Sequence, residues 1–148
     1  MPITSLLKIP DGLSDRHAAA MMLKGMTACY LIRHTFRVKP GMTVLVHAAA
    51  GRVGLILCQW PHHLQATVIG TVDSDEKAAL TRAHGYDHQT VYTRQGFVQT
   101  VRALTGGNGV DIIYDGVGRD AFADSLDFLR PRGMMVAYGN ALWSCPSG

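Results

Sequence analysis

Short apolar runs alternate with stretches of helix-forming residues along most of the chain. The apolar runs are short and rich in Val, Ile, Leu and Met, and several of them are followed at once by small or polar residues. They predict strands at residues 43–47, 67–72, 89–92, 110–115 and 134–138. The stretches between them predict helices at about 52–63, 75–84, 96–104 and 120–129, and a longer helix runs from about residue 14 to 33 or 34. This alternation with short links predicts a doubly wound parallel sheet in a three-layer α/β/α fold.

Several single residues refine these boundaries. Ser14 or Asp15 can cap the first helix, and Gly25 and Thr27 mark an expected break or close approach within it. Pro61 removes a hydrogen bond late in the helix at 52–63, so that helix is expected to end early or to bend. Gly85 is placed to close the helix at 75–84, and residues 131–133 are expected to turn into the last strand.

The first strand ends at a cluster of small residues that is the most informative local feature. Ala49 occupies the place of a usual first glycine, and Gly51 and Gly54 hold the second and third places. This strand–turn–helix order is typical of a dinucleotide-binding Rossmann βαβ unit, in which the N–H groups at the start of the helix face a diphosphate. The alternative is a packing turn, which any α/β protein can contain.

The end of the second strand bears on the cofactor. Sites for NAD usually place a carboxylate at this strand tip to bind the ribose hydroxyls, but the tip residue here is Val72. The groups that could instead hold a 2′-phosphate are Ser74, Lys77 and Tyr92. Asp73 and Asp75 would repel such a dianion if they faced it, and Lys77 could equally be a solvated helix residue.

Composition restricts the class of protein further. The 148 residues suit one domain, and no run approaches the ~20 apolar residues of a membrane span. Lys8 and Asp11 come too early for a signal peptide, and the net charge of +3 is scattered, so nucleic acid is not implied as a partner. The sparse cysteines (Cys29, Cys58 and Cys145) indicate a reducing, cytoplasmic setting, and the dispersed histidines predict no metal site.

Four runs of sequence together resemble a known family. They are AAAMMLKGMTACYLIRHTFRVKPGMTVLVHAAAGRVGLILCQW, GTVDSDEKAAL, IYDGVG and RGMMVAYGNA. They are similar to the cofactor domain of NADPH:quinone oxidoreductases, the zinc-free, zeta-crystallin-like branch of the medium-chain dehydrogenases/reductases. The resemblance covers nearly the whole chain. One departure is Arg52, which stands where the family has glycine.

The resemblance implies a set of NADPH-binding residues. The Gly51 turn and the backbone of Arg52 and Val53 would meet the pyrophosphate. Other residues would hold the 2′-phosphate: Ser74, Lys77 and Tyr92. The nicotinamide half would be lined or flanked by Thr27, Tyr30, Val117, Gly139 and Asn140. The implied reaction is hydride transfer from NADPH to a quinone or another electrophilic small molecule, with no metal and no obligate protein acid.

The resemblance also implies a larger catalytic unit. Family members carry a GroES-like domain that forms one wall of the active-site cleft, so residues 1–148 are expected to be the dinucleotide-binding domain of such a unit, with no catalytic residue assigned and a possible homodimer. Three other functions remain open: a non-catalytic NADPH-binding, crystallin-like module, an enoyl or alkenal reductase of the same superfamily, and an unrelated Rossmann-like enzyme such as a methyl transferase.

Overall fold

The computed structural model of the chain describes residues 3–84, 86–91 and 97–139. Its centre is a five-stranded parallel sheet with the strand order β3-β2-β1-β4-β5. The strands are β1 (Thr43–Val46), β2 (Thr67–Val72), β3 (His88–Val91), β4 (Val110–Asp115) and β5 (Leu129–Ala137). The order reverses between β1 and β4, which is the switch point at which doubly wound sheets bind ligands.

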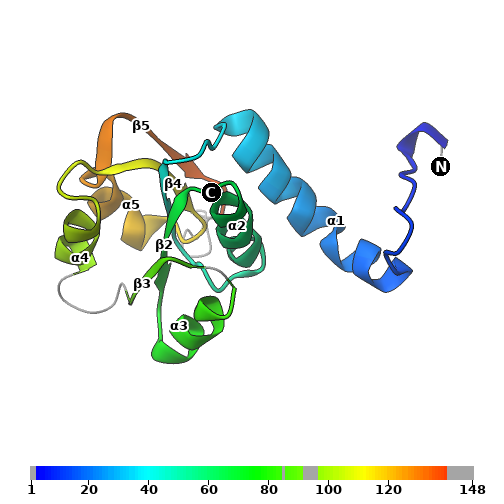
Figure 1. Ribbon diagram of the computed structural model, residues 1–148, viewed down its shortest axis with the longest axis horizontal. Helices are drawn as coiled ribbons and strands as arrows, with labels where there is room; N and C mark the ends of the chain where they lie inside the picture. The colour runs from blue at the N-terminus through cyan, green and yellow to red at the C-terminus, as the bar shows by residue number, and fades with distance from the viewer. Residues whose placement is uncertain (1–2, 85, 92–96, 140–148) are drawn as a thin grey trace, which may run out of the picture.

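Helices cover both faces of the sheet (Figure 1). The α-helices are α1 (Asp15–Cys29), α2 (Arg52–His63), α3 (Asp75–Arg82), α4 (Phe97–Leu104) and α5 (Arg119–Leu126), with the short η1 (Ile3–Ser5) and the π-helix η2 (Tyr30–Thr35). Side chains of α1, η2, α2 and α3 pack on one face of the sheet, and a second apolar cluster that includes Val101 of α4 packs on the other. The predicted three-layer Rossmann-type fold is therefore confirmed.

Successive side chains of each strand point to opposite faces of the sheet, and this alternation produces the two cores. In β1, Val44 and Val46 belong to the cluster under α1 and α2, whereas Leu45 belongs to the cluster under α4. All three are fully buried, as expected for a central parallel strand that is covered on both faces. The same alternation continues past the end of β1, so the residue that follows Val46 faces α5.

The first helix differs from the sequence-based expectation. Ser14 caps it as predicted, because the Ser14 side chain accepts a hydrogen bond from the His17 backbone N–H. The expected break at Gly25 and Thr27 was wrong, since α1 continues to Cys29 and the Thr27 hydroxyl donates to the Leu23 carbonyl within the helix. The irregularity comes one turn later, where the wider turns of η2 begin.

Much of α1 is exposed. Figure 1 shows α1 extending away from the sheet, with η2 at the end that meets the body of the molecule. Only Ala28 is buried within α1, and large apolar side chains remain in solvent: Met21, Met22, Leu23 and Met26. An apolar surface of this kind is typical of a helix that another protein surface covers.

Three other boundaries also differ from the expectation. Helix α2 does not end early at Pro61, which is buried inside the helix, and the last residue of α2 is His63. Helix α5 ends at Leu126 rather than at about 129, because Leu129 already pairs with Val110 in the sheet. Residues 131–133 were expected to precede the last strand, but they form an irregularity inside it, with Arg132 at a φ of 68°. Gly85, the expected helix-closing residue, lies outside the described residues.

Candidate functional site

The carboxyl ends of the strands meet at one edge of the sheet, as parallel pairing requires. Val46 is level with Gly70 of β2 and with Tyr114 of β4, and Asp115 is level with Ala137 of β5. The segments that follow β1, β2, β4 and β5 therefore lie side by side. These segments carry most of the cofactor-binding residues predicted from the sequence, so the structure brings those residues to one edge.

The turn between β1 and α2 is tight and without a side-chain cap. Ala48 adopts a positive φ of 53°, and the Gly51 N–H donates to the Ala48 carbonyl at 2.8 Å. Gly51 precedes α2 as its N-cap in an extended conformation, and within the described residues no side chain caps this helix end. A Cβ on Gly54 would collide with the Ala48 carbonyl oxygen and would lie 2.8 Å from that of Ala49. The turn thus needs glycine at position 54 and leaves the start of α2 open to an anion.

Tyr86, to which the sequence assigned no role, supports this turn through a hydrogen bond. The Tyr86 hydroxyl donates to the Ala49 carbonyl at 2.9 Å, and its ring lies where a side chain at Gly70 would otherwise be. Burial raises the pKa of Tyr86 well above its usual range, so the phenol stays protonated and remains a donor. The shape of the turn therefore depends on a contact between β2, the segment before β3 and the turn itself.

The end of β2 carries an ion pair between exposed groups. The Lys77 ammonium donates to the Asp73 carboxylate at 2.6 Å, and this hydrogen bond, as its largest cause, lowers the pKa of Asp73. Ser74 is the N-cap of α3, and its side chain accepts from the Lys77 backbone N–H. Two of the three residues predicted to hold a 2′-phosphate thus lie together, while Tyr92 lies outside the described residues.

The end of β4 is held by a buried carboxylate. Asp115 Oδ1 accepts hydrogen bonds from the N–H groups of Val117 and Gly118, at 2.8 and 3.0 Å. Asp115 is fully buried, and its other oxygen, Oδ2, has no hydrogen-bond partner among the described residues. Val117, predicted to flank the nicotinamide, is 7% exposed and therefore occupies a fixed position at this edge.

The end of β5 packs directly on the end of β4. A Cβ on Gly116 would lie 2.7 Å from the Tyr138 hydroxyl, and a Cβ on Gly139 would lie 3.1 Å from the Gly116 carbonyl oxygen. Burial, with the nearby Asp115 charge as a smaller cause, raises the pKa of Tyr138 to about 12. Gly139 thus lies against the loop that carries Val117, and Asn140 lies outside the described residues.

A buried histidine connects three of these segments. His47 directly follows β1 and is fully buried. Its ring nitrogens lie 2.7 Å from the Thr71 hydroxyl and 2.6 Å from the Ser125 hydroxyl. Burial lowers the pKa of His47 to about 4, against a smaller opposing effect of Asp115. The imidazole is therefore neutral near pH 7 and bridges two hydroxyl groups.

The remaining predicted residues lie around this edge. Arg52 is the first residue of α2 and is exposed, and Val53 after it is partly buried. Tyr30 is 57% exposed at the start of η2, and the Tyr114 hydroxyl donates to the neighbouring Leu31 carbonyl at 3.0 Å, which holds η2 over the end of β4. Thr27 lies one turn before Tyr30, on the part of α1 nearest the sheet.

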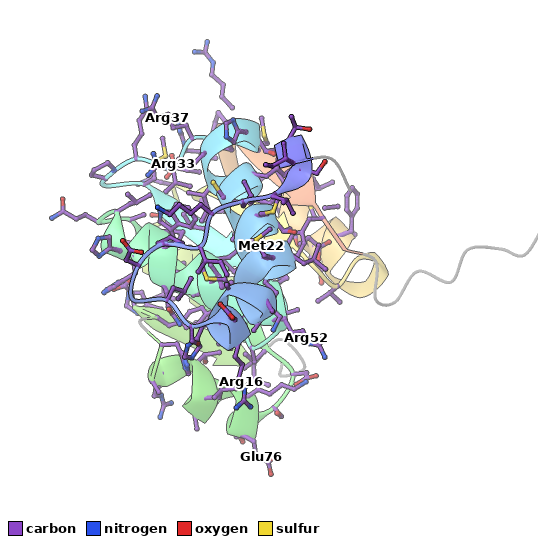
Figure 2. The ribbon with its side chains drawn as sticks, turned by 90° about the vertical axis from the view of Figure 1, so that its right-hand side faces the viewer. Arg16, Met22, Arg33, Arg37, Arg52 and Glu76 are labelled. Atoms are coloured by element: carbon purple, nitrogen blue, oxygen red, sulfur yellow. The ribbon has the colours of Figure 1, made fainter. Side chains whose placement is uncertain are left out.

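A cavity of about 280 Å³ lies at the opposite edge of the sheet. Arg33, Arg37 and Lys39 line it, and the Arg33 guanidinium lies 5.6 Å from the centre of the Trp60 ring. Figure 2 places Arg33 and Arg37 at one end of the view and Arg52 and Glu76 at the other. The cavity is therefore separate from the candidate cofactor edge.

The described residues contain neither a candidate metal-binding cluster nor a candidate membrane-spanning helix. No group of three or more His, Cys, Asp or Glu side chains there could hold a metal ion. None of the helices there has the length and apolar character that crossing a bilayer requires.

The residues that shape the site from within were not predicted from the sequence. His47, Tyr86, Asp115 and Ser125 were not assigned any role there. The only signal was a polar residue at the end of an apolar strand, as at His47 and Asp115, since a buried polar group needs a partner. That signal could have marked the two positions but could not have identified their partners.

Comparisons with known proteins agree with this geometry. The sequence profile of the zinc-binding dehydrogenase family matches residues 53–146. A 2-haloacrylate reductase from a Burkholderia species is 53% identical over 142 residues, which are 95% of this chain and 43% of that protein. A crystal structure of a Pseudomonas syringae quinone oxidoreductase superposes with a TM-score of 0.89 at 46% identity, covering 95% of this chain and 43% of that one.

One of the related structures contains the cofactor. It is an Escherichia coli quinone oxidoreductase complexed with NADPH, with a TM-score of 0.84 at 45% identity over 89% of this chain and 40% of that one. The chain thus spans about two fifths of the length of these relatives. The profile match covers well over half of the chain and includes α2 from Val53 onward and the ends of β2 and β4. The chain therefore belongs to the zinc-binding dehydrogenase family, and the relatives described here are a 2-haloacrylate reductase and quinone oxidoreductases.

Proposed function

We propose that these 148 residues are the NADPH-binding domain of an oxidoreductase that transfers a hydride from NADPH to a quinone. The observation that carries the proposal is the uncapped start of α2 at the Gly51–Gly54 turn, which lies beside the ends of β2 and β4. The NADPH complex of the Escherichia coli relative supports the identity of the cofactor. Calorimetry of the unmodified chain with NADPH and with NADH tests the proposal, and tighter binding of NADPH is expected.

The residues at this edge fit such a cofactor. The Gly51 turn would let the pyrophosphate approach the backbone, where the N–H groups of Arg52 and Val53 can donate. Lys77 and Ser74 would hold the 2′-phosphate together with Tyr92. Val117, Gly139 and Asn140 would flank the nicotinamide and its ribose, with Thr27 and Tyr30 on its other side. When bound, the cofactor would supply the hydride, and the role of this chain would be to hold the nicotinamide ring against the acceptor.

A second candidate activity is reduction of an activated carbon–carbon double bond. The 53% identity to a 2-haloacrylate reductase favours it, since that enzyme's name describes an unsaturated acid as substrate. The enoyl or alkenal reductase expected as an alternative from the sequence belongs to the same class. Following NADPH absorbance with a simple quinone and, separately, with 2-chloroacrylate distinguishes the two acceptors. A protein that binds NADPH but oxidises it with neither would be the non-catalytic module.

The first prediction concerns the preference for NADPH over NADH. Lys77→Ala is expected to weaken NADPH binding about 10- to 100-fold, which corresponds to the loss of one charge-assisted hydrogen bond to the 2′-phosphate. Binding of NADH should change less than threefold, because NADH lacks that phosphate. Titration calorimetry of both cofactors measures the difference.

Two matched variants sharpen this test. Asp73→Asn removes the carboxylate that now pairs with Lys77 and should strengthen NADPH binding, since the ammonium becomes free for the phosphate. Lys39→Ala removes a positive charge at the opposite edge of the sheet and should leave both affinities unchanged. Equal losses for NADPH and NADH in the Lys77 variant would contradict the assignment.

The second prediction concerns the arginine that replaces a family glycine. Arg52→Gly and Arg52→Ala are both expected to leave NADPH affinity within about threefold, because the exposed side chain leaves the backbone N–H to donate to the phosphate. The alanine variant controls for the extra backbone freedom of glycine. A loss above about tenfold in both variants would mean that the guanidinium is itself a phosphate ligand.

The wider setting of the protein is also a proposal. We infer that catalysis needs a second, GroES-like domain that covers the exposed apolar face of α1, since the relatives are more than twice as long and Met21, Met22, Leu23 and Met26 are exposed.

The free thiols of Cys29 and Cys58 support a reducing, cytoplasmic compartment. The edge strand β5 is a surface through which a homodimer could form.

A further inference from the structure

We propose that His47 is a positioning residue for the nicotinamide half of the cofactor, because it joins three of the segments that form the candidate site. The inference rests on the proposed function. His47 would not touch the cofactor, and its effect would pass through the Ser125 hydroxyl on α5 to the loop that carries Val117.

The contacts of His47 define the first step. Its backbone N–H donates to the Tyr114 carbonyl at 2.9 Å, so His47 continues the pairing of β1 with β4. Its ring lies on the α5 side of the sheet, 2.7 Å from the Thr71 hydroxyl and 2.6 Å from that of Ser125. One side chain thus bridges β2, just before Asp73 and Ser74, to α5, which follows the loop after β4.

The protonation state of the ring makes this bridge directional. A neutral imidazole donates a hydrogen bond from one nitrogen and accepts one at the other, so one hydroxyl accepts from the ring and the other donates to it. Burial keeps His47 neutral, with a pKa of about 4. Both ring nitrogens are therefore used, and loss of either hydroxyl would remove a hydrogen bond from a buried ring nitrogen.

The second step leads from Ser125 to Val117. Helix α5 begins directly after Gly118, and Ser125 lies in its last turn, where it is fully buried. Before the helix, Asp115 Oδ1 accepts from the N–H groups of Val117 and Gly118. The loop is therefore fixed at one end by Asp115 and at the other by the contact of α5 with His47. The adenosine half of the candidate site, at Ser74 and Lys77, does not depend on α5.

The experiment compares two ligands on the 148-residue chain. NADPH occupies the whole site, whereas adenosine 2′,5′-bisphosphate lacks the nicotinamide half. Ser125→Ala removes the hydroxyl that holds α5 and should weaken NADPH binding about tenfold, while the affinity for the bisphosphate should change less than twofold. Titration calorimetry with both ligands measures the two affinities, and thermal unfolding shows whether the variant is folded.

Two further variants serve as control and safeguard. Thr81→Val removes another buried hydroxyl, which donates to the Ala78 carbonyl in α3, and should not change the ratio of the two affinities. Thr71→Val breaks the other end of the bridge without changing side-chain size and should reproduce the selective loss of NADPH binding. It replaces Ser125→Ala if that variant fails to fold.

The outcomes separate the inference from the proposed function. Equal losses for both ligands, or no loss for either, would overturn the role of His47 even though the unmodified chain binds NADPH. If the unmodified chain binds neither ligand, the proposed function fails and this inference fails with it.

Discussion

Gly54→Ala is expected to destabilise the protein by about 3 kcal/mol and to abolish detectable NADPH binding. The added methyl group would collide with the Ala48 carbonyl oxygen and would lie 2.8 Å from the carbonyl oxygen of Ala49 and 3.0 Å from the carbonyl carbon of Ala49. All of these atoms are backbone, so no side-chain rotation relieves the overlap, and α2 must move away from the turn. Urea denaturation gives the free energy of unfolding, and calorimetry gives the affinity.

Gly25→Ala is the matched control for this change. Gly25 lies inside α1, and a Cβ there would meet only the end of the Met21 side chain at 3.9 Å. Alanine at this helical position should leave NADPH binding unchanged and stabilise the protein by up to about 1 kcal/mol. If the Gly54→Ala variant had the same free energy of unfolding and the same NADPH affinity as the unmodified chain, the turn would be wider than the structure describes.

Acidification should destabilise the protein between about pH 6.5 and pH 4 through His47. The pKa of this imidazole is lowered from 6.5 to about 4 in the folded state because of burial. As the pH falls below 6.5, the unfolded chain binds a proton that the folded chain does not, so the free energy of unfolding decreases. The loss amounts to roughly 3 kcal/mol by pH 4, at about 1.4 kcal/mol for each pKa unit. Urea denaturation at a series of pH values measures it.

His47→Gln is the variant that isolates this effect. Glutamine can both donate and accept hydrogen bonds but does not titrate. The variant should therefore be less stable at pH 7, and its free energy of unfolding should lose much of its pH dependence between pH 6.5 and 5. Below about pH 5, protonation of carboxylates adds to the loss, and the lowered pKa of Asp73 contributes in the same direction. An unchanged slope between pH 6.5 and 5 in the variant would assign the dependence to other groups.

The sequence predicted the fold well where local pattern decides it. The strands at 67–72 and 110–115 have the predicted limits, because each is an apolar run buried on both faces and bounded by polar or turn residues. Helix α2 also begins at its predicted residue, Arg52, since the small-residue turn defines its start. In these segments, local preference and tertiary packing favour the same structure.

Prediction failed where a distant partner decides the structure. The start of β5 at Leu129 depends on its pairing with Val110, which no local pattern in residues 126–133 indicates. The change from α1 to η2 coincides with the hydrogen bond from Tyr114 to Leu31, which joins residues 83 positions apart. Such contacts act against local propensity and cannot be read from the sequence around them.

The same distinction applies to the candidate site. The turn at Gly51 and Gly54 was predicted from neighbouring residues alone. The bridge at His47 could not be, because its partners lie 24 and 78 positions away along the chain. The pairing of Lys77 with Asp73 is local, because the two residues are four positions apart. The structure is needed only to show that this ion pair would compete with a bound phosphate for the Lys77 ammonium.

The π-helix at Tyr30–Thr35 acts as a one-residue insertion in an otherwise regular helix. Its hydrogen bonds reach one residue further than those of an α-helix, as the Phe36 N–H to Leu31 carbonyl bond illustrates. The wider turns absorb the additional residue within η2, so the helix before it and the segment after it keep nearly the relative orientation that ordinary turns would give them. Deleting one residue there would change the direction of side chains inside the segment, such as Arg33 on the face of Trp60, and would leave Val38 in the core. The segment thus accommodates a change of length inside a helix, as surface loops do between helices.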